Sequence, residues 1–115
     1  MRKVTRRPTH PGNIIKEDYL LPLSITIKDM SAKLGVSRKT LSKIINERGI
    51  ITPDMALRLS RAFDTTPDFW LNLQKNFDLW QAEIESQEWK KVKPFPKNRL
   101  HDHNLSLNSE QQNSG

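Results

Sequence analysis

A chain of 115 residues with 19 Lys and Arg against 13 Asp and Glu has a formal charge of +6, and 35% of its residues are hydrophobic. These values describe one small soluble domain and exclude an enzyme with separate cofactor and substrate domains. The lack of cysteine excludes a disulfide framework, a thiolate metal site and a cysteine nucleophile. No window of 18 apolar residues predicts a membrane span, and no apolar segment follows the basic N-terminus, so a cytoplasmic protein is expected.

The positive charge is confined to the first half of the chain. Residues 1–49 contain 11 Lys and Arg against 4 Asp and Glu, whereas residues 50–115 contain 8 against 9. Residues 64–89 alone hold six acidic residues and one lysine. Two regions of opposite charge predict two different partners.

The first nine residues form a separate basic segment. Residues 1–9 contain four Lys and Arg and one proline without a periodic apolar pattern, so we expect an arm without regular structure. Pro11 then opens a stretch whose apolar residues recur at helical spacing, and Pro22 prevents its continuation. This pattern predicts a helix over about 11–21.

Two short helices separated by a glycine follow. Thr26 is an N-cap candidate for a helix over 27–34, and Gly35 can adopt the positive φ that ends it. Ser37 is an N-cap candidate for the next helix, over 38–47. Two helices joined by a tight turn that contains glycine are typical of a helix-turn-helix.

The last two expected helices each begin at a Thr-Pro pair. Thr52 precedes a helix over 53–64, and Thr66 precedes a longer one that runs from 67 into the region of residue 88. Apolar residues of the longer helix alternate at gaps of three and four, a heptad-like stripe that fades after residue 84. This apolar stripe consists of Trp70, Leu73, Phe77, Trp80 and Ile84.

The end of the chain is rich in Pro, Asn, Gln and Ser. It has no periodic apolar residues and cannot bury enough surface to offset the entropy of ordering, so we expect a flexible tail over 93–115. The predicted organisation is an arm over 1–9, an all-α domain of five helices over 10–92 with a C-terminal dimerisation helix, and the tail.

The helix expected over 38–47 has the composition of a DNA-reading helix. When Leu41, Ile44 and Ile45 face the core, the opposite face is polar and positive, with Glu47 as its single acidic residue. Such a helix can lie in the major groove, where Lys suits guanine and Asn or Thr suits other base edges. We expect DNA contacts from Lys39, Lys43 and Asn46, flanked by Thr40 and Ser42, with Ser37 contacting phosphate.

The basic arm has two interpretations. Arg2, Lys3, Arg6 and Arg7 can follow phosphates or enter a minor groove, or they can serve as a solubilising segment. If about six phosphates are neutralised, affinity falls with salt with a log–log slope of roughly −5.

Nothing in the sequence indicates catalysis or a cofactor. The chain has no glycine-rich phosphate loop, serine elbow or paired carboxylates beside an apolar pocket. Its histidines are His10 beside the arm and His101 and His103 in the expected tail, where nothing fixes a metal-binding geometry. We therefore expect neither an enzyme nor a metal site.

The apolar stripe also has two interpretations. It can cover the core of its own chain or form a homodimer interface, and both apply if its first residues face inward. A single helix-turn-helix contacts only a few base pairs. A two-fold dimer on an inverted repeat, with half-sites about 34 Å apart, is therefore the usual arrangement.

Several of these segments together resemble the HigA antitoxins, which are also described as VapI-like members of the Xre helix-turn-helix family. The resemblance covers about residues 7–80. It rests on RPTHPG at 7–12, LGVSRKTLSKIIN at 34–46, ITPDMALRL at 51–59 and TPDFWLNLQ at 66–74.

The resemblance implies a bacterial two-gene module. In such a module an antitoxin dimer binds double-stranded operator DNA and represses its own promoter. It also binds a HigB-type toxin, a small basic ribonuclease that cuts messenger RNA on the ribosome. The DNA-reading positions carried over from the family are Ser37, Arg38, Lys39, Thr40 and Lys43.

Two regions compete as the surface that would meet a toxin. The acidic residues 64–89 suit a basic ribonuclease, whereas the first helix with the arm is the alternative. Two other functions stay open: a stand-alone phage- or plasmid-type repressor without a toxin, and an interaction module whose charge is incidental. The chain after residue 80 departs from the family pattern, so no role is carried over to it.

Overall fold

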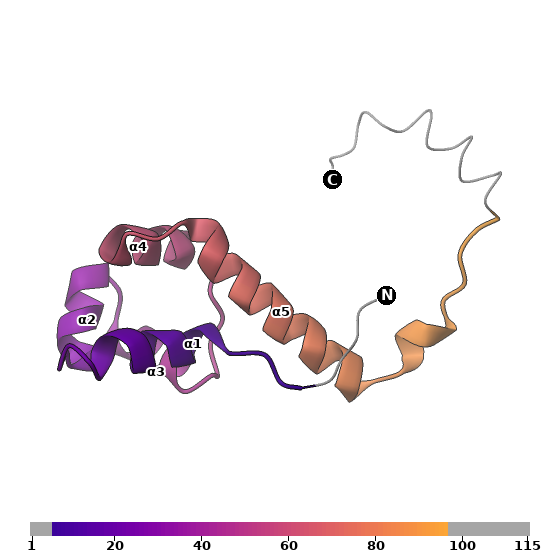
Figure 1. Cartoon of the computed structure of the whole chain (residues 1–115), viewed down its shortest axis with the longest axis horizontal. Helices are drawn as coiled ribbons and strands as arrows, with labels where there is room; N and C mark the ends of the chain where they lie inside the picture. Colours follow the sequence, from indigo (N-terminus) through magenta and orange to yellow (C-terminus); the bar gives the residue numbers. More distant parts are fainter. Residues whose placement is uncertain (1–5, 97–115) are drawn as a thin grey trace, which may run out of the picture. The chain divides into compact units, whose positions relative to one another are not determined.

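Helices account for all the regular structure in the computed structural model, which describes residues 6–96 (Figure 1). Residues 6–85 belong to one unit and residues 86–96 to a second, which is described by itself below. None of the helices in the described part is long and apolar enough to cross a bilayer. The elements are α1 (Pro11–Ile14), the π-helix η1 (Ile15–Leu20), α2 (Ile27–Leu34), α3 (Arg38–Ile45), α4 (Pro53–Phe63), α5 (Pro67–Glu85) and the 3₁₀ turn η2 (Glu88–Lys91).

Side-chain caps begin four of these helices, as predicted. The hydroxyls of Thr26, Ser37, Thr52 and Thr66 each accept a hydrogen bond from the backbone N–H three residues later, at 3.0 to 3.2 Å. These bonds satisfy N–H groups that have no partner within the helix. Gly35 ends α2 with a φ of 73°, which confirms the predicted left-handed cap.

The first predicted helix differs from the observed one in its winding. Only α1 is an α-helix, and η1 continues as a π-helix in which the N–H of Leu21 donates to the carbonyl of Lys16 at 3.0 Å. The wider winding brings Ile15 and Leu20, five positions apart, to the same buried side. The predicted helix over about 11–21 is confirmed in its position, and only its winding differs, because the apolar spacing fits both windings.

Two helix ends also differ from the sequence prediction. Helix α3 ends at Ile45 and not at 47, because Glu47 has a left-handed φ of 62°. Helix α5 ends at Glu85 and does not reach 88. Asp64 has a φ of 54° and ends α4 close to the predicted position.

The core lies between α1, η1, α2, α3 and α4 on one side and the N-terminal part of α5 on the other. Trp70 is fully buried there, and its indole Nε1 donates to the Thr65 hydroxyl at 2.7 Å. Such a partner satisfies the one polar atom of the ring. The other buried apolar residues of this cluster are Ile15, Leu20, Met30, Leu34, Leu41, Ile44, Ile45, Ile51, Met55, Ala56 and Leu59.

Helix α1 packs directly against α3. His10 caps α1, and its Nδ1 accepts a hydrogen bond from the N–H of Gly12 at 2.9 Å. A Cβ on Gly12 would lie 1.9 Å from the carbonyl oxygen of Ile44. The α1 backbone therefore packs against the last turn of α3 at a distance that glycine alone permits.

The second unit contains little regular structure among its described residues. Ser86 accepts a hydrogen bond on its hydroxyl from the N–H of Glu88 at 3.1 Å, and its carbonyl accepts one from Trp89 Nε1 at 2.8 Å. Of the predicted tail, residues 93–96 are described and have no regular structure. Residues 97–115, which include His101 and His103, lie outside the described residues, as do Arg2 and Lys3.

Candidate nucleic-acid interface

The helix-turn-helix consists of α2, a turn at 35–37 and α3. The N–H of Gly35 donates to the carbonyl of Ser31 at 2.9 Å and closes α2. Leu34 before the turn and Leu41 after it are both buried in the common core. Their burial fixes the angle between the two helices and turns the opposite side of α3 outward.

A guanidinium on α4 holds this turn in place. Arg58 Nη1 donates to the carbonyl of Leu34 at 2.8 Å and to that of Gly35 at 3.2 Å, and Arg58 Nε donates to Asp54 Oδ2 at 2.7 Å. The carbonyls at the end of α2 thus gain a charged donor. Sequence reasoning missed this contact, because the Asp54–Arg58 spacing indicates only the pair within α4.

The outer face of α3 carries the cations expected to contact DNA. Arg38 and Lys39 are exposed in the first turn, with Thr40 beside them, and Lys43 is exposed one turn later. Within residues 6–96, none of these three cations forms an ion pair. The structure therefore brings an uncompensated positive charge to the surface of α3.

The neutral polar residues of α3 contact one another. The Ser37 hydroxyl donates to Thr40 Oγ1 at 2.9 Å, and Asn46 Nδ2 donates to Ser42 Oγ at 3.3 Å. Asn46 is exposed and Ser42 is half-buried. These side chains lie along the same helix as the cations, and their contacts with DNA stay a prediction.

The two arginines of the predicted arm that the structure describes have different surroundings. Arg6 is exposed, whereas the guanidinium of Arg7 forms an ion pair with Glu47 after the end of α3. Its Cζ also lies 4.9 Å from the ring centroid of Phe77 and 5.9 Å from that of Trp80, both on α5. Arg7 thus joins the arm to the segment that follows α3 through a charge contact and to α5 through cation–π contacts. No local sequence pattern indicated these partners.

The same region buries His10. Its ring meets Phe77 edge to face at 4.8 Å between centroids. Burial lowers the pKa of His10 below its ordinary value. The negative charge of Glu47 raises this pKa in part, the positive charge of Arg7 lowers it further, and the negative charge of Asp78 also raises it. Sequence reasoning assigned His10 no role.

The apolar stripe on α5 is divided between the core and the surface. Trp70 is fully buried and Phe77 is 7% exposed, so both pack within their own chain. Leu73 and Trp80 are half-buried, and Ile84 is 53% exposed. The first part of the stripe therefore covers the core, which was one of the two interpretations. Dimer contacts by the later residues stay a prediction.

Over 6–96, no group of three or more His, Asp or Glu side chains is arranged to hold a metal ion.

Comparison with known proteins finds the same fold and similar sequences. Residues 16–70 match the helix-turn-helix family. An uncharacterised HTH-type transcriptional regulator of Haemophilus influenzae is 45% identical over 106 residues, which cover 90% of this chain and 95% of that protein. Antitoxin HigA-1 of Vibrio cholerae is 43% identical over 96 residues, covering 83% and 90%. The structure of antitoxin GraA in complex with its operator superposes with a TM-score of 0.73 at 40% identity, covering 83% of this chain and 98% of that one.

The domain is all-helical, and the second helix of its helix-turn-helix presents a cationic face without ion pairs among residues 6–96. These features define the class of helix-turn-helix transcription regulators. Within that class, the chain belongs to the HigA family of antitoxins. The resemblance seen in the sequence is thereby confirmed. The family consists of regulators and not of enzymes.

Proposed function

We propose that this protein is a cytoplasmic, homodimeric antitoxin that binds an inverted repeat in its own operator, represses its operon and neutralises a HigB-type ribonuclease by direct binding. The observation that carries the proposal is the outer face of α3, where Arg38, Lys39 and Lys43 are exposed without an acidic partner within residues 6–96. A helix of this kind gains affinity by replacing the counterions of DNA phosphates.

The framework around α3 supports the same function. Ser37 caps its first turn, Arg58 holds the preceding turn, and Gly12 lets α1 lie against its last turn. A helix held at both ends loses little conformational freedom when it binds, so more of the contact energy appears as affinity. Antitoxin GraA, which has the same fold, forms a complex with its operator.

The DNA-binding part is tested by a mobility-shift assay on the DNA upstream of the gene. We expect the wild type to bind with a log–log salt slope of roughly −5, since about six phosphates are neutralised. The Lys39→Ala/Lys43→Ala variant is expected to lose the shift at physiological salt. Because the proposed homodimer contains each lysine twice, its slope should be shallower by about 3 to 4 where binding is still measurable.

Lys16→Ala/Lys93→Ala is the matched control, since both lysines are exposed and lie outside α2, α3 and α5. This variant is expected to bind like the wild type. Retained binding by the Lys39/Lys43 variant would contradict the assignment of α3 as the DNA-reading helix.

The toxin-binding part is tested by co-expression with the adjacent reading frame. Rescue of growth supports an antitoxin. A chain that binds its operator and gives no rescue is a stand-alone repressor, and one that does neither is an interaction module.

A further inference from the structure

Glu47 is the single acidic residue between positions 30 and 53, the region that contains α3. It lies two positions beyond the end of that helix at Ile45, and its N–H donates to the carbonyl of Ile44 at 3.0 Å. The N–H groups of the next two residues both donate to the carbonyl of Lys43, at 2.8 and 3.0 Å. The turn that carries Glu47 therefore closes on the last turn of α3, beside one of the cations expected to contact DNA.

A carboxylate at this place opposes DNA binding. A duplex carries one negative charge per about 1.7 Å of its axis, and a carboxylate close to it is repelled. The side chain of Glu47 is 29% exposed, so the solvent screens its charge only in part. Binding of α3 to DNA is therefore favoured when a cation of the chain compensates the charge of Glu47.

Arg7 supplies this cation from 40 positions earlier in the chain. Its guanidinium pairs with Glu47 Oε1, and within residues 6–96 it is the one ion-pair partner of that carboxylate. The rings of Phe77 and Trp80, 4.9 and 5.9 Å from Arg7 Cζ, hold the guanidinium from the side of α5. Because arginine stays charged in proteins, the compensation of Glu47 is permanent.

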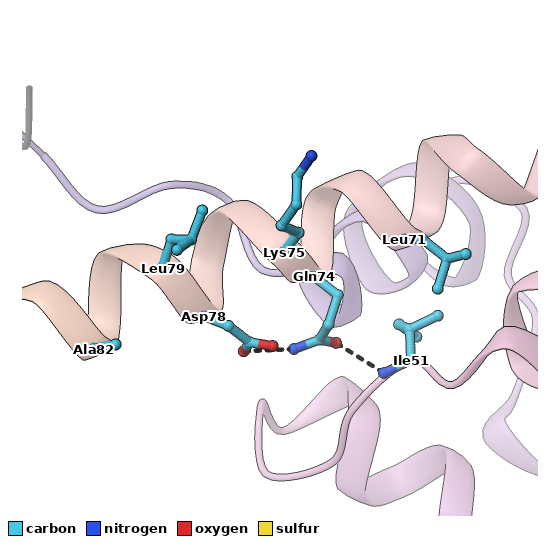
Figure 2. Close-up of a pocket in the computed structure, with 7 residues that line it drawn as sticks. All are labelled: Ile51, Leu71, Gln74, Lys75, Asp78, Leu79 and Ala82. Carbon is cyan, nitrogen blue, oxygen red and sulfur yellow. Dashed lines mark hydrogen bonds between the residues drawn. The ribbon is translucent and has the colours of Figure 1, made fainter. Parts of the chain in front are cut away.

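Another carboxylate of this region, Asp78 on α5, has a partner other than Arg7. Its Oδ1 accepts a hydrogen bond from Gln74 Nε2 at 3.0 Å (Figure 2). The amide of Gln74 is itself fixed, because its Oε1 accepts from the N–H of Ile51 at 2.8 Å. The ion pair of Arg7 is thus made with Glu47, although both carboxylates act on the nearby imidazole of His10.

The neighbouring Arg6 differs from Arg7 in this respect. Arg6 is exposed and forms no ion pair within residues 6–96. A phosphate contact by Arg6 therefore breaks no ion pair, whereas one by Arg7 would leave Glu47 unpaired beside the DNA. The two adjacent arginines are consequently suited to different tasks.

We infer that Arg7 is a positioning residue for operator binding, which acts by neutralising the carboxylate of Glu47 at the end of α3 and does not contact DNA itself. The inference rests on the DNA-binding part of the proposed function. It differs from both interpretations of the arm, phosphate contact and solubilisation, and it leaves direct phosphate contact to Arg6.

Mobility-shift titrations of the full chain on the DNA upstream of the gene test the inference by a double-mutant cycle. Arg7→Ala is expected to weaken binding about tenfold, because Glu47 is left unpaired in both copies of the proposed homodimer. Glu47→Gln alone should bind at least as tightly as the wild type. Arg7→Ala/Glu47→Gln is expected to bind within about twofold of the wild type and with the same salt slope, since no phosphate contact has been removed.

Arg7→Ala/Asp78→Asn is the matched control. It removes the same amount of negative charge, and the asparagine oxygen can still accept the hydrogen bond of Gln74, but the variant is expected to bind as weakly as Arg7→Ala. Arg7→Lys keeps the charge and should keep most of the affinity. Circular dichroism verifies folding. Both double variants lack the packing of Arg7 on the rings of α5, so a recovery specific to Glu47→Gln identifies charge as the cause.

Each other outcome overturns the inference. Arg7→Ala that binds like the wild type shows that Arg7 has no part in binding. If Arg7→Ala/Glu47→Gln stays as weak as Arg7→Ala, a slope shallower by about 2 assigns Arg7 to direct phosphate contact, and an unchanged slope assigns it to packing. Equal recovery with Asp78→Asn reduces the effect to net charge.

The proposed function fails separately. A wild type that does not shift the DNA refutes operator binding together with the inference. Loss of the shift in Lys39→Ala/Lys43→Ala, combined with any of the contrary results for Arg7, leaves operator binding by α3 standing and refutes the role of Arg7 alone.

Discussion

His10 shows how one buried side chain connects the packing of the N-terminal segment to pH. Its Nδ1 accepts the hydrogen bond of the Gly12 N–H, so this nitrogen must be unprotonated in the folded chain. Because the pKa of His10 is lowered by burial, the unfolded chain takes up the proton more readily than the folded chain. Folding stability is therefore full above about pH 6.5, the ordinary histidine value, and falls as the pH drops below it.

We expect the melting temperature of the wild type to fall more than that of His10→Asn between about pH 7.5 and pH 5.5. Asparagine is a good N-cap residue and does not titrate, so the variant keeps a cap while losing the proton linkage. Thermal unfolding followed by circular dichroism measures both proteins. Glu47, Arg7 and Asp78, which face the imidazole, are present in both, so their own contributions largely cancel. An equal fall in both proteins would exclude His10 as the source.

At the scale of the helices, the clamp on the helix-turn-helix depends on Arg58. Three acceptors surround its guanidinium, two of them carbonyls at the end of α2. Arg58→Ala removes the charged donor from these carbonyls and is expected to lower the free energy of unfolding by about 1–2 kcal/mol. It should also weaken operator binding, because α3 is then less firmly oriented.

Urea unfolding and the mobility-shift assay measure the two effects of Arg58→Ala. Arg61→Ala, an exposed arginine of the same helix without an ion pair among residues 6–96, is the control and should change stability little. If both alanine variants behave alike, Arg58 is not a clamp.

The helices and their caps could be predicted because their causes are local. Thr26, Ser37 and Thr52 each bond to a backbone N–H three residues away, and Gly35 acts through its own φ. The outward face of α3 followed from its apolar period. The π-winding of η1 was not predictable, since the same apolar spacing suits an α-helix.

The contacts that join the elements could not be predicted, because they connect distant parts of the chain. Arg7 meets Glu47 across 40 positions, Arg58 meets Leu34 across 24, and Gln74 meets Ile51 across 23. Each of these side chains, taken alone, has the pattern of an ordinary exposed polar residue. Their partners are defined only after the helices have packed.

At the scale of the whole molecule, the positive and the negative charges lie in different regions of the sequence, and these regions suit two different partners. The cations of α3 serve the DNA-binding part of the proposed function, and the acidic region between 64 and 89 is its candidate surface for a basic toxin. The competing surface on the first helix also carries acidic residues, Glu17 and Asp18. Two matched pairs of substitutions can therefore decide between the surfaces.

We expect Asp64→Asn/Asp68→Asn to weaken toxin binding several-fold and to reduce growth rescue on co-expression, because two exposed negative charges are lost. Asparagine tolerates the left-handed φ at position 64, so the fold is preserved. Glu17→Gln/Asp18→Asn is expected to rescue growth like the wild type. The reverse result would assign the toxin to the first helix.

The packing of Arg7 against α5 and the segment that follows α3 also limits the reach of the arm. Arg2 is five residues from this anchor, and five fully extended residues span at most about 18 Å. Along a duplex that rises about 3.4 Å per base pair, this distance corresponds to roughly five base pairs. The second half-site of an inverted repeat lies about 34 Å away. In the proposed homodimer on an inverted repeat, a five-residue arm attached at Arg7 would be too short to reach the second half-site, so each protomer's arm would contact only its own half of the operator.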